Sequence, residues 1–266
     1  MAASSKAVKV YGWAASPFVA RVLVCLEEAG VDYELVAMSR DAGDHRRPDH
    51  LARNVRAALH QLHRPSISTF HASLAYAFSV TDSLTHDLLA CLQPFGQVPV
   101  LEDGDLTLFE SRAIARHVLR KHKPELLGGG GLEQSAIVDV WLEVEAHQHE
   151  PAAGAIVMEC LITPLLGGAP DQAAVGENAG KLRRVLDAYE ARLSRSRYLA
   201  GDSVSVADLS HFPLMRYFMA TEHAALVEAL PRVKAWWEEL AARPAARKVA
   251  ELMPLDLGLS SRKHEQ

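Results

Sequence analysis

The sequence predicts an α/β domain followed by an all-α domain, and three observations support this division. Strand-like and helix-like patterns alternate near the start of the chain. Asp103-Gly104 stands between two β-prone runs, Val98 to Leu101 and Leu106 to Phe109, which is a strong short-range hairpin signal. Every segment beyond Gly131 follows a helical period instead. The 266 residues are enough for two modest domains.

The first elements are predicted to be a strand, a helix and a second strand. Residues 8–12 are β-prone, and so is the run from Tyr33 to Met38. Between them, apolar residues recur every three to four positions from Val19 to Leu26. Ser16-Pro17 opens this helix, because serine is favoured at the N-cap and proline at the first helical position, and Gly30 closes it.

A hairpin and a further helix complete the first domain. The polar pair Glu110-Ser111 directly precedes a helical run over residues 112–121. The pair therefore lies where the first N–H groups of the helix are unpaired, and it could hold an anion. With a short helix at Asp44 to Asn54, the order is strand, helix, strand, helix, strand, strand, helix (βαβαββα). This order is typical of a thioredoxin-like domain.

The segment from Val55 to Gln93 differs from the rest of this domain. Its 39 residues contain no Lys or Glu and follow neither a helical nor an alternating period. A structureless stretch of this length argues against membership of a compact domain. We therefore predict an insertion. Because every Val codon begins with GT and a Gln codon can be CAG, the segment could be translated from a stretch with the GT and AG ends of an intron. We therefore predict a retained intron or a gene-model error rather than an evolved loop.

The glycine-rich run before Leu132 marks the predicted domain boundary. The first domain covers residues 1–121, interrupted at 55–93; residues 122–131 form a linker, and 132–266 the all-helical domain. A capping box formed by Ser205 and Asp208 starts a buried helix. Three further helices have apolar faces that should pack on one another. These faces are Ile137, Val140, Trp141 and Val144; Leu182, Val185, Leu186, Tyr189 and Leu193; and Val233, Trp236, Trp237 and Leu240.

Composition narrows the class of protein. The net charge is −5, from 28 basic and 33 acidic residues without a long basic cluster, so we expect no nucleic-acid partner. No apolar run approaches the roughly 20 residues that span a bilayer, and we expect no membrane association and a cytoplasmic location. The three cysteines form no Cys-x-x-Cys pair, and His147 and His149 do not share a helix face. We therefore expect neither a disulfide framework nor a metal site.

Several motifs together resemble those of glutathione S-transferases, most closely the phi class of plants. The main one is Pro94-Phe-Gly-Gln-Val-Pro-Val-Leu, continued to Glu110-Ser-Arg-Ala-Ile. Tyr198-Leu-Ala-Gly-Asp, Ser205-Val-Ala-Asp-Leu and Val233-Lys-Ala-Trp-Trp also match. In the family, Asn directly precedes Pro-Phe-Gly-Gln. Here Asn54 does so only when Val55 to Gln93 is removed. The resemblance otherwise covers nearly the whole chain.

The resemblance implies an activity and its partners. A homodimer in the cytoplasm would conjugate the thiolate of reduced glutathione to small hydrophobic electrophiles, a detoxification reaction. Glutathione is then a cosubstrate, and no separate cofactor is implied. Phe95 matches the aromatic residue that locks the dimer in the family; without the resemblance it would be a buried turn aromatic.

Ser16 is the residue expected to activate the sulfur. From Ser16-Pro17 alone, an ordinary N-cap is the more frequent reading, but the resemblance places Ser16 on the family's catalytic serine. The thiolate, not the thiol, is the nucleophile. A hydroxyl donor at a helix N-terminus can favour the thiolate, and lowering a thiol pKa by about two units takes only about 2.7 kcal/mol.

The resemblance also assigns two sets of binding residues. In the family the proline at Pro99 is cis and turns the preceding peptide toward glutathione, whereas an ordinary trans proline is the commoner case without the resemblance. Met158 and Ile162, at four-residue spacing, would otherwise be plain helix core, and Arg40 stands where an aromatic residue often occurs. The glutathione-binding set is His45, Arg46, Gln97, Val98, Pro99, Glu110 and Ser111. The hydrophobic-substrate set is Ala15, Pro17, Arg40, Met158 and Ile162.

Two alternatives to the conjugating enzyme remain open at this point. A non-catalytic carrier of hydrophobic ligands would use the same cleft with weak thiolate activation. An inactive isoform would result if the insertion at Val55 to Gln93 disrupts the glutathione site and the dimer contact.

Overall fold

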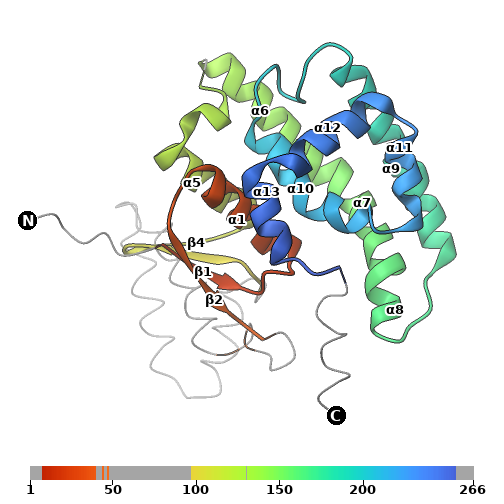
Figure 1. Cartoon of the computed structure of the whole chain (residues 1–266), viewed down its shortest axis with the longest axis horizontal. Helices are drawn as coiled ribbons and strands as arrows, with labels where there is room; N and C mark the ends of the chain where they lie inside the picture. Colours follow the sequence, from red (N-terminus) through yellow and green to blue (C-terminus); the bar gives the residue numbers. More distant parts are fainter. Residues whose placement is uncertain (1–7, 40–43, 45–46, 48–96, 130, 256–266) are drawn as a thin grey trace, which may run out of the picture. The chain divides into compact units, whose positions relative to one another are not determined.

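The computed structural model of the chain describes residues 8–39, 44, 47, 97–129 and 131–255 (Figure 1). It confirms the predicted class, a thioredoxin-like domain with a mixed sheet and an all-helical domain. The chain forms two compact units, one of residues 1–13 and 32–114 and the other of residues 14–31 and 115–266. The predicted end of the first domain at residue 121 and the predicted end of the linker at residue 131 stay predictions.

The sheet has four strands in the order β2-β1-β3-β4. These are β1 (Val8–Gly12), β2 (Tyr33–Ala37), β3 (Val100–Asp103) and β4 (Leu106–Phe109). Strand β1 pairs parallel to β2 and antiparallel to β3, and β3 pairs antiparallel to β4. All four strands were predicted. The short helix expected at Asp44 to Asn54 and the segment Val55 to Gln93 lie outside the described residues, apart from Asp44 and Arg47.

The hairpin turn is displaced by one residue from its predicted place. Asp103 still pairs with Leu106 in the ladder, so Gly104 and Asp105 are the two central turn residues. Gly104 has φ +65, a left-handed conformation that glycine adopts without a steric penalty. A glycine at the first of two central positions suits a two-residue hairpin. The Asp-Gly signal therefore gave the hairpin correctly but not its centre.

Helix α1 (Pro17–Glu28) belongs to the helical unit, where it packs against α10 (Val206–Phe218) and α13 (Pro244–Glu251). Every side chain from residue 19 to residue 26 is buried. Gly30 ends the helix as predicted, with φ +64. The side chain of Arg243 donates from Nη2 to Glu28 at 2.8 Å, which ties the end of α1 to the start of α13.

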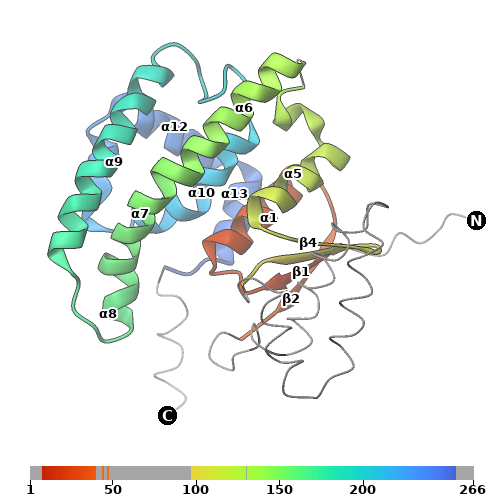
Figure 2. The same ribbon diagram turned by 180° about the vertical axis from the view of Figure 1, so that it is seen from behind.

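The long broken helix of the helical unit packs on α9 and α10, and Figure 2 shows α6, α7 and α8 beside α9. Two π-helical turns interrupt the long helix, and such turns are frequent at functional sites. In chain order, the remaining elements are α5 (Ser111–His122), η2 (Pro124–Leu127), α6 (Leu132–Val144), the π turn η3 (Glu145–His149), α7 (Glu150–Val157), the π turn η4 (Met158–Ile162), α8 (Thr163–Leu165), α9 (Gln172–Leu193), η5 (Glu222–Ala224), α11 (Ala225–Glu228) and α12 (Pro231–Ala242).

The predicted apolar face of α6 was wrong for two of its four residues, since Trp141 and Val144 are half-buried and Trp141 packs against Tyr189. Ile137 is 39% exposed and Val140 is 58% exposed, whereas Val138 and Leu142 are buried. The buried stripe continues at the spacing of a helix through two polar residues, Glu145 and His149. The predicted face was chosen from apolar residues alone, so it could not include a buried stripe whose second half is polar. The predicted faces of α9 and α12 are largely confirmed.

Asp208 holds the start of α10 in the core. One carboxylate oxygen accepts from the backbone N–H of Leu199 and the indole N–H of Trp236, both at 3.0 Å. The other accepts from the N–H and hydroxyl of Ser205 at 2.9 and 2.8 Å. Burial raises the pKa of Asp208, and these hydrogen bonds act in the opposite direction. The predicted capping box is therefore confirmed, and it also joins α10 to α12.

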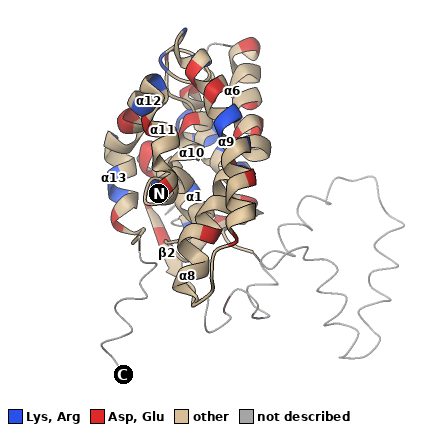
Figure 3. Cartoon of the chain, turned by 90° about the vertical axis from the view of Figure 1, so that its right-hand side faces the viewer, with Lys and Arg blue, Asp and Glu red and all other residues tan. Residues whose placement is uncertain are grey.

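Charged residues of both signs are interspersed along the helices (Figure 3). Several form pairs one helical turn apart, such as Lys181 with Glu177 at 2.7 Å and Lys234 with Glu238 at 3.8 Å. Such exposed pairs contribute little to stability. Among the described residues, no helix has the length and apolar character that a membrane span requires.

His149 should make the stability of the protein depend on pH. Burial, with a smaller contribution from His211, lowers the pKa of His149 from 6.5 to about 3. The unfolded chain therefore binds a proton at this residue below about pH 6.5, whereas the folded chain does not until about pH 3. The stabilisation is present above pH 6.5 and is lost as the pH falls. Between pH 6.5 and 4.5 we expect this residue to lower the free energy of unfolding by about 2 to 3 kcal/mol.

Urea unfolding at pH 7 and pH 4.5 measures this effect. His149→Gln should lose most of the pH-dependent difference. His147→Gln is the matched control, because His147 lies two residues away with a side chain that is 72% exposed and 3.0 Å from Glu143. Equal pH dependence in the parent and His149→Gln would contradict the prediction.

Candidate functional site

Ser16 stands at the N-cap of α1 and is 4% exposed. Its carbonyl accepts the first helical hydrogen bond, from the N–H of Ala20 at 2.9 Å. Its side chain, however, makes no capping hydrogen bond to the first turn of the helix. The hydroxyl group at this helix N-terminus is therefore not used as an ordinary cap, and it can donate to another acceptor.

The segment before Ser16 is anchored to the helical unit by Tyr217 of α10. The Tyr217 hydroxyl donates to the carbonyl of Ala15 at 2.7 Å. Burial raises the pKa of Tyr217 to about 12, so the phenol stays protonated and able to donate at physiological pH. This hydrogen bond fixes the backbone immediately before the predicted catalytic serine.

Tyr217→Phe should therefore lower activity while the protein stays folded. The loss of one hydrogen bond should cost about 1 kcal/mol of stability. If the bond positions Ser16, glutathione conjugation should fall by roughly threefold to tenfold at constant pH. Steady-state kinetics beside urea unfolding measures both changes, and Tyr198→Phe, at another tyrosine hydroxyl of the helical unit, is a control. Unchanged kinetics in Tyr217→Phe would remove the positioning role.

Helix α1 is also held by a buried cluster of three charged residues. Arg21 donates from Nη2 to Glu145 at 3.1 Å and to Glu150 at 2.6 Å. The Arg21 and Glu145 side chains are almost fully buried, and that of Glu150 is partly exposed. Buried charges are tolerated only when paired. The cluster therefore joins the helix that carries Ser16 to the π turn η3 and the start of α7.

The residues before β3 belong to the sheet unit. The peptide bond between Val98 and Pro99 is cis, as expected from the resemblance. Val98 and Pro99 are buried and Gln97 is exposed. Strand β3 begins at Val100, so these three residues lie just outside its ladder with β1. Their predicted role in holding glutathione stays a prediction.

Glu110 and Ser111 join β4 to α5. Glu110 has φ +68, and among the described residues it is the only one other than glycine with a positive φ. This left-handed conformation is uncommon outside glycine, and it clusters at binding sites. The Glu110 carbonyl accepts from Ile114 at 2.9 Å, and Ser111 is buried at the first position of α5. The backbone thus places an exposed carboxylate beside a helix N-terminus.

The predicted hydrophobic-substrate residues are only partly described. Met158 is 50% exposed and Ile162 is partly exposed, so the alternative that both are plain helix core is wrong. They are the first and last residues of the π turn η4. Ala15 and Pro17, on either side of Ser16, are partly exposed as well. Arg40, His45, Arg46 and Phe95 lie outside the described residues.

A thioredoxin-like sheet, an all-helical unit and a serine at the N-terminus of the first helix define a class of protein. They fit the predicted class, a two-domain transferase in which a hydroxyl donor at a helix N-terminus favours a thiolate. Residues 15–121 match the family model for the glutathione S-transferase N-terminal domain, and residues 149–244 match that for the C-terminal domain.

Individual relatives agree with the family models. The chain is 60% identical over 255 residues to glutathione S-transferase 4 of Zea mays, an alignment that covers 96% of this chain and 97% of the relative. A solved glutathione S-transferase I from maize, in complex with an atrazine glutathione conjugate, is 44% identical with a TM-score of 0.76; 93% of this chain and 98% of that chain are covered.

Glutathione transferase F7 from Populus trichocarpa is 41% identical with a TM-score of 0.76, over 93% of this chain and 100% of that chain. The chain belongs to the glutathione S-transferase family, and its likeness to the phi class of plants is confirmed. The prediction of a glutathione transferase is therefore confirmed too.

Three features near the site were missed by the sequence reasoning. They are the Arg21 cluster with Glu145, the anchor at Tyr217 and the left-handed backbone of Glu110. The run Glu145 to Glu150 carries four ionisable residues, and this density of charge could have indicated a buried polar cluster. Nothing in the sequence indicated which residue they would meet.

Proposed function

We propose that the protein is a cytoplasmic, homodimeric glutathione transferase that conjugates reduced glutathione to small hydrophobic electrophiles, with Ser16 as the catalytic residue. The observation that carries this proposal is the buried Ser16 hydroxyl, which makes no capping hydrogen bond at the N-terminus of α1. A hydroxyl donor and the helix dipole both favour a thiolate over a thiol. Glutathione enters as a cosubstrate and leaves in the product.

Two sets of residues would hold the substrates. Gln97, Val98, Pro99, Glu110 and Ser111 would bind the peptide, with His45 and Arg46 near its glycine carboxylate. The amino group of the γ-glutamyl residue suits the Glu110 carboxylate, and its carboxylate suits the N-terminus of α5. The electrophile would contact Ala15, Pro17, Arg40, Met158 and Ile162. Solved relatives with lactoylglutathione and with an atrazine glutathione conjugate support substrates of this kind.

The homodimer is supported by exposed apolar side chains on one helix. Leu132, Ile137 and Val140 of α6 are all exposed in the single chain. Grouped apolar side chains on a surface often mark an interface. By resemblance, Phe95 would add an aromatic lock to it.

The decisive experiment compares glutathione-resin binding and conjugation of an activated aryl halide in two chains. One is the full chain, and the other lacks Val55 to Gln93. We expect the shortened chain to bind and conjugate. Failure of both chains would remove the enzyme proposal. Activity in the shortened chain alone would establish the inactive-isoform alternative for the full chain, and equal activity would eliminate it.

A carrier of hydrophobic ligands is the second candidate. It was predicted to use the cleft of the electrophile, but the observation that favours a carrier lies elsewhere on the helical unit. A half-open surface groove of about 590 Å³ lies between the η3–α7 stretch and α9. Val144, Pro151 and Val185 supply apolar lining, and Lys181 and Arg184 supply positive charge. This combination suits an apolar anion. An anionic naphthalene sulfonate dye tests it: Ser16→Ala should leave dye affinity intact, whereas Arg184→Gln should weaken it.

A further inference from the structure

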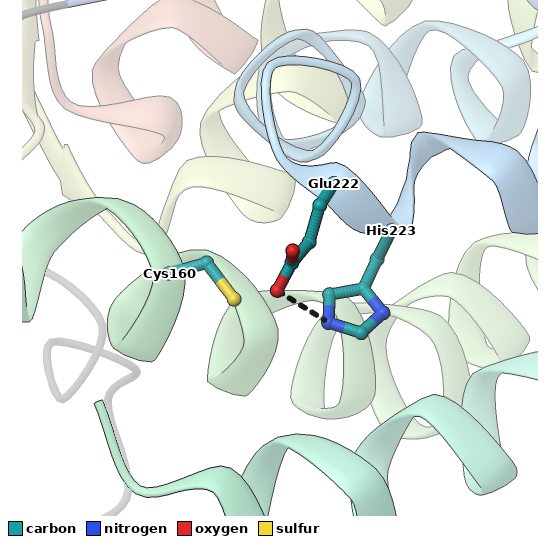
Figure 4. A group of neighbouring side chains, drawn as sticks. All are labelled: Cys160, Glu222 and His223. Carbon is teal, nitrogen blue, oxygen red and sulfur yellow. Dashed lines mark ion pairs between the residues drawn. The ribbon is translucent and has the colours of Figure 1, made fainter.

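A thiol, an imidazole and a carboxylate meet on one side of the helical unit (Figure 4). Cys160 comes from the middle of the π turn η4, and Glu222 and His223 open the 3-10 turn η5. One ligand atom from each residue lies within 4.8 Å of the other two. None of these residues was assigned to glutathione or to the electrophile.

The imidazole of His223 has a buried nitrogen with no hydrogen-bond partner. Its Nε2 atom is shielded from solvent, and the described residues offer it no hydrogen bond. Glu222 Oε1 lies 3.8 Å from this nitrogen, which is too far for a hydrogen bond. A buried polar atom without a partner is costly, so this nitrogen can accept a ligand from outside the chain.

The backbone on both sides of the cluster is fixed. Thr221 Oγ1 accepts from the N–H of His223 at 3.2 Å and donates to the carbonyl of Phe218 at 2.7 Å. On the other side, Glu159 Oε2 accepts from the N–H of Asp171 at 2.9 Å, next to Cys160. All three ligand residues therefore project from restrained turns. Only Glu222 has a largely exposed side chain that is free to move inward.

We propose that Cys160, Glu222 and His223 form a binding site for a thiophilic divalent cation, with Zn²⁺ as the best fit. Zn²⁺ takes sulfur, nitrogen and oxygen ligands in tetrahedral geometry, and a thiolate ligand disfavours Mg²⁺ and Ca²⁺. Ligands at the usual bond lengths would lie roughly 3.3 to 3.8 Å apart. A rotation of the exposed Glu222 side chain and a small shift of the thiol would close the site. A fourth position would stay open to water.

Binding of the cation must displace the thiol proton. Burial, aided by Glu222 and Glu159, raises the pKa of Cys160, so the free residue is a thiol at neutral pH. The sulfur–hydrogen bond breaks, the sulfur electron pair binds the cation, and the proton passes to solvent. No oxidant or reductant is needed.

Titration of the apo chain with Co²⁺, a spectroscopic substitute for Zn²⁺, tests the proposal. Glutathione is left out because its own thiol would bind the metal. The background carries Cys91→Ser, so that Cys160 and the buried Cys25 are the remaining thiols. We expect one equivalent of Co²⁺ to produce a thiolate-to-metal charge-transfer band that added Zn²⁺ removes.

Variants distinguish the proposed ligands from surface residues. Cys160→Ser and Cys160→Ala should both abolish the band, and His223→Gln and Glu222→Gln should weaken Co²⁺ affinity at least about tenfold. His147→Gln, which removes a histidine paired with Glu143 outside the cluster, should change nothing. Zn²⁺ should raise the melting temperature of the Cys91→Ser parent but not of Cys160→Ser.

Three results would overturn the assignment. They are the absence of a thiolate band in the Cys91→Ser parent, a band that persists in folded Cys160→Ser, and equal weakening by His147→Gln and His223→Gln. Circular dichroism of each variant establishes that it is folded.

Discussion

Replacing Ser16 with alanine should lower kcat/KM for glutathione conjugation by roughly 100-fold at pH 6.5, the usual cost of losing one preorganised donor to a developing or bound anion. The reason is that the hydroxyl at the N-terminus of α1 would no longer stabilise the glutathione thiolate. The difference in kcat/KM between the parent and Ser16→Ala should shrink as the pH is raised, because the thiol of glutathione then ionises without a hydrogen bond from Ser16. Pre-steady-state and steady-state kinetics of conjugation, recorded at pH 6.5 and at higher pH, measure the effect.

The same variant separates catalysis from capping. The Ser16 side chain makes no capping hydrogen bond, so Ser16→Ala should change the free energy of unfolding by less than about 0.5 kcal/mol. A true N-cap would lose about 1 kcal/mol instead. Ser16→Thr keeps a hydroxyl and should retain part of the activity. A stability loss near 1 kcal/mol with intact kinetics would show that Ser16 is only a cap.

Replacing Arg21 with methionine should destabilise the protein by about 3 to 5 kcal/mol, because the buried carboxylate of Glu145 would lose its ion pair with Arg21. Arg21 and Glu145 are 1% and 0% exposed, with Nη2 and Oε1 3.1 Å apart. The change removes a charge but keeps a side chain of similar length, so lost packing contributes little. Urea unfolding at pH 7 gives the free energy directly.

Two further variants show whether the uncompensated charge is the cause. Adding Glu145→Gln to Arg21→Met should recover part of the loss, because the fully buried carboxylate of the cluster is then replaced by a neutral amide. Arg116→Met is the matched control: Arg116 pairs with Asp139 at 3.4 Å on the surface and should cost less than about 1 kcal/mol. Equal losses in Arg21→Met and Arg116→Met would contradict the interpretation.

Local signals were enough to predict most elements of the fold. Ser16-Pro17 and Gly30 marked the ends of α1, and Asp103-Gly104 marked the hairpin. These signals work because capping, proline geometry and turn chemistry depend on residues within a few positions of one another. The register of the turn was missed by one residue, since cross-strand pairing decides whether Asp103 belongs to the strand or to the turn.

The candidate site was predicted mainly from the resemblance to the family, and less from the chemistry of the residues themselves. Ser16, Pro99, Glu110 and Ser111 fall on family motifs, whereas from their own neighbourhoods they would have been caps and turn residues. The structure adds what no local pattern encodes: an unused hydroxyl at Ser16 and a left-handed backbone at Glu110. Both depend on how the flanking elements direct the chain.

By itself, then, the sequence determined the two kinds of domain, the presence of the four strands, the two ends of α1, and the family. Only the tertiary structure decided which face of α6 is buried, that Arg21 meets Glu145 across 124 positions, and that Cys160 lies beside His223. The physical reason is the range of the interactions. Helix and turn preferences act between neighbours in the sequence, whereas buried charges and ligand clusters form between residues that only packing brings together.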